Sequence, residues 1–293
     1  MMKIKKLSVL GIILLFIGTS INPSTAQDTT NPLPTSGGKW WYVGGSGPGN
    51  YSIIQDAVDN ASDGDTVFVY DDSSPYYHPI VIKKSICLMG EDKDTTIIDM
   101  RKREIEAIKI DYPTNNVIIT GFTIQNTTWG GINVLDGCCY INISNNNILY
   151  NDYCGICLNE GCDYNVISGN IIRFQTNGIY ATLSFYNTIK RNTFSDLDYG
   201  LLCAMVRNWH IEQNNFLNNK IDVSLYVEKY FWQLFPLIIH FDNNYWSQVR
   251  TFPKLIVSVG LIFFIPGLFI LFLPVPIINI DWHPATTPFD TRV

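Results

Sequence analysis

Apolar residues in the middle of the chain recur with a fixed period and do not form long helical runs. Five eight-residue segments share one pattern, and the third residue of each is an isoleucine: Ile119, Ile143, Ile167, Ile189 and Ile211. The spacings are 24, 24, 22 and 22 residues. A second register lies between these segments, at Gly131-Ile132, Gly155-Ile156, Gly178-Ile179, Gly200-Leu201 and Lys220-Ile221. Two sets of residues that recur with the same spacing over so long a stretch indicate an internal structural repeat.

A repeat of this length is compatible with two kinds of solenoid. Leucine-rich repeats require leucines at fixed intervals and often place a helix in each turn. The apolar residues here are mainly Ile, Val and Phe in short runs, broken by Asn and Gly. Such runs are typical of strands and tight turns. The pattern therefore favours a parallel β-helix, an all-β fold in which successive coils stack about 4.8 Å apart.

Asparagine occupies one position of the repeat in four consecutive coils, as Asn146, Asn170, Asn192 and Asn214. In a stacked solenoid, equivalent side chains lie above one another, and inward amides can hydrogen bond along the axis. Asparagine also tolerates the left-handed backbone of tight corners. We therefore expect a structural ladder at these positions. The alternative is that these four side chains contact a ligand.

The residues before the repeat predict a cap on the open end of the solenoid. A Ser52-x-x-Gln55 capping box and one apolar face predict a helix over about 52–62, ended by Gly64. A solenoid needs such a cap because its end would otherwise expose strand edges and core. The strands predicted to follow are 66–70, 80–82, 86–88, 96–99 and 107–111.

The two ends of the chain differ from the middle. Three lysines, an apolar core and small residues predict a signal peptide over 1–26, with an uncleaved anchor helix as the alternative. Residues 27–39 are polar and rich in Pro and Gly, which predicts a linker. The segment 255–280 has no charged residue and predicts a membrane anchor, followed by a tail over 281–293. The alternative for 255–280 is an apolar flap over the end of the main domain.

Charge excludes one class of partner. The 293 residues carry 20 Lys and Arg against 26 Asp and Glu, a formal net charge of −6. Nucleic-acid binding depends on a basic surface, so we expect no nucleic-acid partner. Charged residues make up only 16% and hydrophobic residues 46% of the chain, which also excludes a disordered acidic protein.

Three stretches resemble a known family. They are SIIQDAVDNASDGDTVFVY from Ser52, HPIVIKKSICLMGEDKDTTIID from His78, and FDNNYWS from Phe241. Together with the Asn-marked coils they resemble the NosD-like family and, more distantly, the pectin-lyase-like enzymes. The resemblance covers about 40–250 and implies a right-handed parallel β-helix. It further implies two chemistries to look for, which are action on polysaccharides and copper handling.

Carboxylates are the candidates for polysaccharide chemistry. Asp152, Asp196 and Asp198 fall in comparable loops before Gly155 and Gly200. Two of these carboxylates could lie on one wall of the solenoid and serve in acid–base catalysis. The alternative is that they are solvated corner acids. The Asp–Asp–Arg set that the resemblance to pectin methylesterases would imply is missing, so the sequence leans away from an enzyme.

Copper would require converging His, Met or Cys ligands. The local grouping with these residue types is Cys203, Met205 and His210. The sequence predicts no cofactor and no firm metal site.

Among the seven cysteines, Cys138 and Cys162 both lie five residues before an aligned isoleucine, so they should stack in adjacent coils within disulfide range. The alternative is two small residues in one core column.

These observations predict a secreted β-helix protein of the cell surface, tethered to membrane lipid through 255–280. Its expected role is structural, adhesive or carbohydrate-binding, with a cell-surface polysaccharide as the partner. Five aromatic residues are candidates for stacking on sugars: Trp129, Tyr153, Tyr186, Tyr199 and Trp209. The alternatives are a polysaccharide lyase or hydrolase that uses the carboxylates, and a copper-handling accessory protein.

Overall fold

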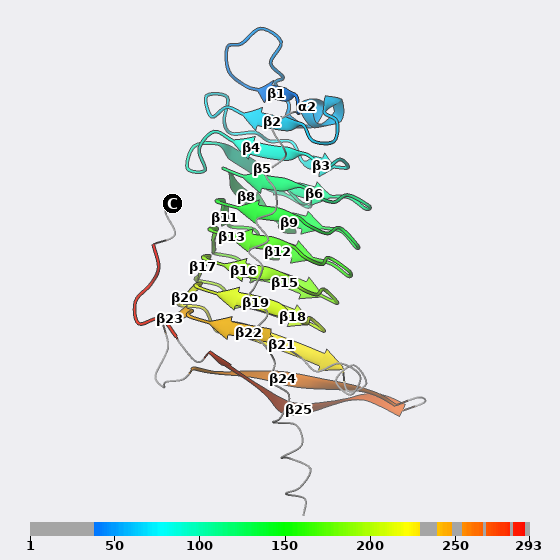
Figure 1. The fold of residues 1–293 in the computed structure, drawn as a ribbon, viewed down its shortest axis with the longest axis vertical. Coiled ribbons are helices and arrows are strands. Elements are labelled where there is room, and N and C mark those ends of the chain that lie inside the picture. Colours follow the sequence, from blue (N-terminus) through cyan, green and yellow to red (C-terminus); the bar gives the residue numbers. More distant parts are fainter. Residues whose placement is uncertain (1–37, 229–238, 248–253, 266–267, 282–283, 291–293) are drawn as a thin grey trace, which may run out of the picture. The chain divides into compact units, whose positions relative to one another are not determined.

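The computed structural model describes residues 38–228, 239–247, 254–265, 268–281 and 284–290. The predicted signal peptide and nearly all of the predicted linker lie outside these residues. The described chain winds through the stacked coils of a parallel β-helix, which confirms the predicted fold class (Figure 1). Each full coil contributes one short strand to each of three parallel sheets, named A, B and C in chain order.

The sheets consist of the following strands. Sheet A contains β1 (Trp40–Val43), β2 (Thr66–Val69), β4 (Cys87–Gly90), β7 (Ile118–Thr120), β10 (Asn142–Ser144), β13 (Val166–Ser168), β16 (Thr188–Lys190), β19 (Trp209–Glu212) and β22 (Ile239–Asp242). Sheet B contains β5 (Ile97–Arg103), β8 (Thr123–Thr127), β11 (Asn147–Leu149), β14 (Ile171–Arg173), β17 (Thr193–Ser195), β20 (Asn215–Leu217) and β23 (Tyr245–Trp246). Sheet C contains β3 (Ile80–Ile82), β6 (Ile108–Ile110), β9 (Gly130–Val134), β12 (Cys154–Leu158), β15 (Asn177–Thr182), β18 (Tyr199–Ala204) and β21 (Ile221–Glu228).

The strand registers match the repeat predicted from the sequence. The five predicted isoleucines pair in order along sheet A and are buried: Ile119, Ile143, Ile167, Ile189 and Ile211. The second register holds along sheet C as far as Leu201. Its last predicted member is wrong by two residues, because Leu201 pairs with Val223 and Ile221 pairs with Tyr199. Val223 keeps the inward position, whereas Ile221 is 44% exposed.

Buried asparagines form a hydrogen-bonded ladder at the corner between sheets A and B. The side-chain amide of each member donates to the Oδ1 of the next, from Asn146 to Asn170 at 3.1 Å and from Asn170 to Asn192 at 3.0 Å. The chain of bonds continues from Asn192 to Asn214 at 3.1 Å. The backbone N–H of each of these residues also donates to the Oδ1 of its neighbour, so each coil is fixed to the next.

The ladder extends further than the sequence analysis predicted. Asn214 donates to Asn244 at 3.0 Å, and the Asn244 amide donates to Asp281 Oδ2 at 3.2 Å. Asp281 also accepts from the Trp246 indole N–H at 3.1 Å. An ionised carboxylate only accepts hydrogen bonds, so it is suited to end a chain of donors.

The cap lies at the N-terminal end of the solenoid, as predicted, but its helix is shorter. Helix α2 spans Ile54–Asn60 and buries Ile54, Ala57 and Val58 against the first coils. The predicted capping box is wrong, because the N-cap residue is Ile53 and no side chain caps the helix. Gln55 instead binds the backbone of Val81, accepting from its N–H at 2.7 Å and donating to its carbonyl at 3.1 Å. The helix ends before Gly64 because Ala61 is extended.

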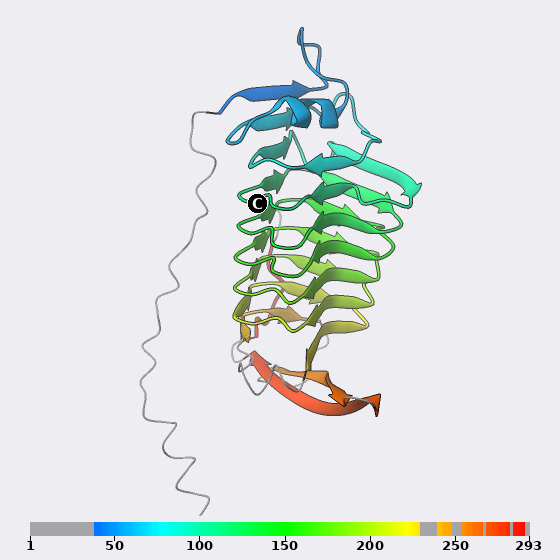
Figure 2. The same ribbon diagram turned by 90° about the vertical axis from the view of Figure 1, so that its right-hand side faces the viewer.

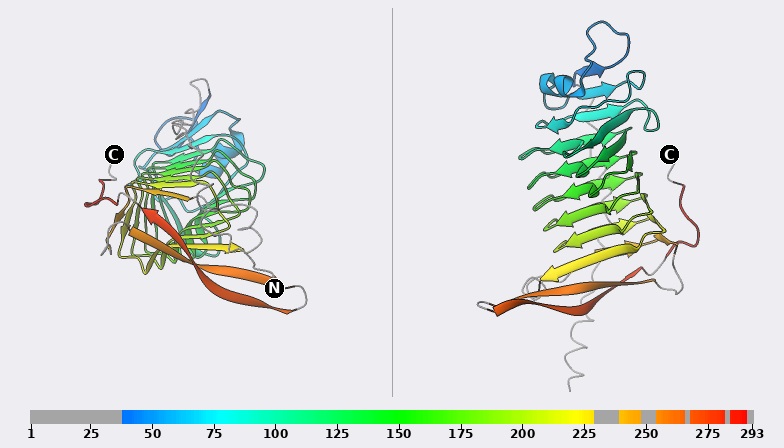
Figure 3. Two further views of the ribbon diagram at one scale, coloured as in Figure 1. Left: turned by 60° about the horizontal axis from the view of Figure 1, so that its bottom comes forward. Right: turned by 180° about the vertical axis from the view of Figure 1, so that it is seen from behind.

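The described residues of the apolar segment 255–280 form strands, whereas the sequence analysis expected a membrane anchor there. Strands β24 (Lys254–Ile265) and β25 (Leu268–Asp281) pair as an antiparallel hairpin. β24 pairs with β21 and β25 pairs with β22, and the hairpin crosses the end of the last coil (Figures 2 and 3). This arrangement corresponds to the alternative prediction of a flap. No helix in the described part of the chain is long and apolar enough to span a membrane.

The segment 284–290 lies on the outer face of sheet B. The Asn215 amide donates to the Phe289 carbonyl at 2.8 Å, and the Phe289 N–H donates to Asn215 Oδ1 at 2.7 Å. Ala285 forms a bridge to Tyr245 and donates to the Asn244 carbonyl at 2.9 Å. This contact partly covers sheet B near its C-terminal end.

Candidate functional site

The outer face of sheet C combines polar, aromatic and cationic side chains. One column on this face runs through successive strands in register: Val81, Lys109, Asn133, Cys157, Tyr180, Leu202 and Ser224. The residues on either side of each column member point inward, as Ile108 and Ile110 do around Lys109, and they are buried. The alternation follows from the two-residue period of a strand. This face therefore presents chemically varied groups at intervals of about 4.8 Å.

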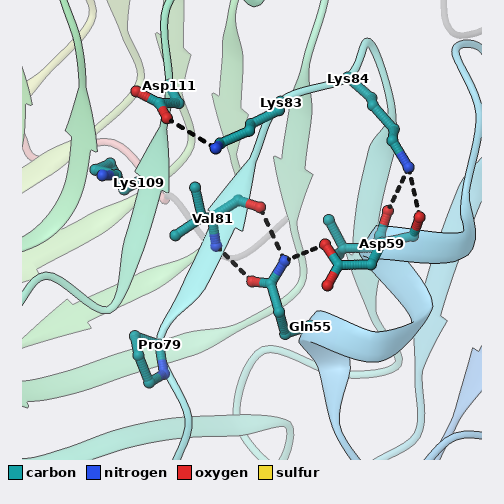
Figure 4. A pocket seen from close by; sticks show the side chains of 9 residues that line it. Gln55, Asp59, Pro79, Val81, Lys83, Lys84, Lys109 and Asp111 are labelled. Carbon is teal, nitrogen blue, oxygen red and sulfur yellow. Dashed lines mark hydrogen bonds and ion pairs between the residues drawn. The ribbon is translucent and has the colours of Figure 1, made fainter.

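A pocket of about 450 Å³ lies at the N-terminal end of this face. It is lined by Gln55, Val58, Asp59, Pro79, Val81, Lys83, Lys84, Lys109 and Asp111 (Figure 4). Helix α2 forms one wall, and strands β3 and β6 with the residues after them form the other. Gln55 joins the two walls through its bonds to Val81, and its amide also donates to Asp59 Oδ1 at 2.8 Å. The pocket is therefore held open by the contact of the cap with the first coil.

Two exposed rings lie on consecutive coils at the edge of the same face, where the chain enters sheet C. Trp129 is 56% and Tyr153 47% exposed, and each directly precedes a strand of sheet C. Tyr180 lies beside Tyr153 with ring centroids 5.7 Å apart and planes tilted by 53°. Partial burial, and then the neighbouring Tyr180 hydroxyl, raise the pKa of Tyr153, so the phenol is neutral at neutral pH. These rings can accept a flat ligand on their open faces.

The other aromatic candidates are placed differently. Trp209 is fully buried, and its indole N–H donates to the Ser184 carbonyl at 3.0 Å. Tyr186 stacks on Tyr164 with centroids 4.9 Å apart and an angle of 2°, so one face of its ring is covered. Tyr199 lies on sheet C in register with Ile221 and is half-buried. Trp129 and Tyr153 are thus exposed rings, whereas Trp209, Tyr186 and Tyr199 are wholly or partly covered by other residues.

The disulfide in the described residues also lies on this face, and it is not the predicted one. Cys154 is bonded to Cys157 within β12, and both sulfur atoms lie over Gly130, which has no side chain to obstruct them. Cys138 and Cys162 are free thiols. They stack in adjacent coils, but the Cys162 thiol donates to the Leu135 carbonyl at 3.1 Å. The core-column alternative therefore describes this pair, and the predicted disulfide is wrong.

The three candidate carboxylates do not converge on one point. Asp152 and Asp198 occupy equivalent positions just before sheet C in coils two apart, and Thr176 holds that position in the coil between them. Their backbones are therefore about 10 Å apart. Asp152 forms an ion pair with Lys102, and Asp198 forms one with Lys220 at 2.6 Å. Asp196 lies in the adjacent turn, where its backbone is left-handed with φ of 56°. Each carboxylate thus has its own surroundings, and the three do not form a shared acid–base pair.

The candidate copper ligands do not form a site either. Cys203 is buried in the core, where burial raises the pKa of its thiol far above the ordinary value. His210 instead stacks on His240 in the next coil, with ring centroids 4.9 Å apart. Among the residues that the structure describes, no group of three or more His, Cys, Asp and Glu side chains is placed to hold a metal ion. The candidate residues Cys203 and His210 thus have separate surroundings, in the core and in a stacked histidine pair respectively.

The fold is a capped parallel β-helix, and the outer face of sheet C carries chemically varied side chains that a ligand can reach. The family model described as "Periplasmic copper-binding protein (NosD)" matches residues 58–250, and the chain belongs to this family. No curated protein matches the sequence.

Solved structures similar to the chain include pectate lyase Pel9A, at a TM-score of 0.55 and 12% identity, over 71% of this chain and 68% of that chain. An alginate lyase from Paenibacillus sp. str. FPU-7 is similar at a TM-score of 0.42 and 12% identity, over 67% of this chain and 79% of that chain. At such identities the likeness concerns the fold.

Proposed function

We propose that the chain is an exported, non-catalytic β-helix protein that binds a polysaccharide along the outer face of sheet C. The observation that supports this most is the pair of open rings on consecutive coils, Trp129 and Tyr153. The C–H faces of sugar rings pack on aromatic rings, and sugar hydroxyls need hydrogen-bonding partners at the edge of the same surface. Tyr180 lies beside Tyr153, and Asp152, which is paired with Lys102, directly precedes Tyr153 in the chain, so both can supply such groups there.

An extended ligand fits this face better than a single sugar. The rings directly precede strands β9 and β12 of a sheet that continues over several coils, which offers an extended surface. The similar solved structure of a pectate lyase is named for a polymer, which is consistent with a polymer ligand here. Export is inferred from the basic start and apolar core of 1–26.

Affinity electrophoresis of the full chain in gels containing soluble polysaccharides tests the proposal. We expect retardation by at least one polysaccharide, and Trp129→Ala or Tyr153→Ala should weaken it about tenfold, since truncating a ring at a binding surface costs about 1–2 kcal/mol. Trp40→Ala is the matched control, because Trp40 is 48% exposed on β1 of sheet A.

Two results would contradict the proposal. One is an absence of retardation across acidic and neutral polysaccharides. The other is an equal loss in Trp129→Ala and Trp40→Ala, which would show that binding does not use sheet C.

A further inference from the structure

The pocket between the cap and the first coils has an unbalanced positive charge. It contains three ammonium groups, from Lys83, Lys84 and Lys109, and two carboxylates, from Asp59 and Asp111, which leaves a net charge of +1. The whole chain carries a net charge of −6. A local excess of positive charge in an acidic protein concentrates anions at that point of the surface.

The partners of these groups show which cation is available. Lys84 donates to the carbonyls of Asp59 and Ala61, each at 2.6 Å, and thereby satisfies the C-terminal end of α2. Lys83 forms an ion pair with Asp111 at 3.5 Å. None of the ion pairs among the described residues includes Lys109. Lys109 is thus the pocket cation that is left to meet a ligand (Figure 4).

The rest of the lining is apolar or already satisfied. Val58, Pro79 and Val81 provide hydrocarbon surface. Gln55 uses its amide on Val81 and Asp59, so it holds the pocket in place. The pocket therefore combines a fixed apolar wall with one free ammonium group, at a volume suited to a small molecule.

We propose that this pocket binds a small organic carboxylate about the size of one sugar ring, with Lys109 as its principal partner and Lys83 beside it. A carboxylate neutralises the net charge of +1. A phosphate group carries about −1.5 to −2 at pH 7 and would add repulsion from Asp59 and Asp111. The site lies on sheet C but is independent of polymer binding at Trp129.

Isothermal titration of the full chain with sodium glucuronate tests this proposal, with glucose as the neutral comparison and inorganic phosphate as the second anion. We expect glucuronate to bind and glucose not to bind. The Lys109→Met variant keeps the hydrocarbon stem but not the charge, and should lose at least about tenfold in affinity, since a charge-assisted hydrogen bond is removed. Lys190→Met removes an equal charge from the outer face of sheet A and should bind like the unaltered chain.

Several outcomes would overturn the proposal. They are no binding of glucuronate at millimolar concentration, tighter binding of phosphate than of glucuronate, equal binding of glucose, or unchanged affinity in Lys109→Met with its circular dichroism preserved. Trp129→Ala should leave glucuronate binding unaffected. A failure of polymer binding alone would therefore refute the proposed function and leave this site standing.

Discussion

Replacing Asn192 by alanine removes the centre of the asparagine ladder. Its amide donates to the Ile167 carbonyl at 2.9 Å, to the Lys190 carbonyl at 3.1 Å and to Asn214 Oδ1 at 3.1 Å. Its Oδ1 accepts from both the backbone N–H and the amide of Asn170, each at 3.0 Å. One buried side chain thus connects three coils through five hydrogen bonds, four of which are buried and one, to the Lys190 carbonyl, partly buried.

The cost of this change can be estimated from the groups left behind. The backbone N–H of Asn170 loses its acceptor, and an unsatisfied buried group costs about 1–3 kcal/mol. The Asn170 amide still donates to the Ile143 carbonyl at 2.8 Å, and Asn214 Oδ1 still accepts from the backbone N–H of residue 192. Each of these two groups therefore keeps one hydrogen-bond partner. With the void added, we expect a loss of about 3–5 kcal/mol in the free energy of unfolding.

Urea unfolding followed by far-UV circular dichroism measures this loss, with the slope checked against that of the unaltered chain. Asn142→Ala is the matched control, because Asn142 is half-buried on β10 and its Oδ1, although buried, accepts no hydrogen bond from the described residues, so that its removal leaves no donor without a partner. We expect that control to change stability by no more than about 0.5 kcal/mol. A loss below about 1 kcal/mol in Asn192→Ala, or one equal to the control, would refute the view that the ladder stabilises the stack.

Three further predictions concern other groups. Burial raises the pKa of Cys162 to about 12, so its thiol stays protonated at pH 8, and iodoacetamide should label it only after unfolding; mass spectrometry showing rapid native labelling would contradict this. Partial burial and then His240 lower the pKa of His210 below its ordinary 6.5, so its NMR titration midpoint should lie lower and should rise in His240→Ala. His210 therefore binds its proton more tightly in the unfolded state than in the folded state, so it lowers the free energy of unfolding as the pH falls below about 6.5. An NMR titration midpoint of His210 at or above 6.5 would refute this. Asp281→Ala leaves the donors of Asn244 without a terminal acceptor and should cost about 2–4 kcal/mol in urea unfolding, whereas no loss would show that the ladder needs no terminus.

The sequence predicted the repeated part of the fold well. Equivalent residues of consecutive coils are neighbours in space, so the period of 22–24 residues itself states which side chains meet. Ile167 and Ile189 could be placed in one core column, and Asn170 and Asn192 in one ladder, from spacing alone. The pairing of Leu201 with Val223 was missed because the repeat pattern weakens in the last coils.

The ends and the candidate sites depended on contacts that no period describes. Asp281 reaches the ladder from a segment outside the repeat, and nothing in the local sequence connects it with Asn244. The pocket joins Gln55 of the cap helix to Val81 of a strand 26 positions away. Lys109 is available for a ligand only because Lys83 and Lys84 have other partners, which is a property of the assembled pocket.

The stacking of like residues was therefore fixed by the sequence itself, because strand alternation and a constant coil length act on every repeat in the same way. Tertiary structure decided what happens where the repeat stops. The uncharged run over 255–280 suits a helix or a strand equally by composition. It forms β24 and β25 because the last coil presents strand edges whose backbone groups need partners, and the hairpin supplies them.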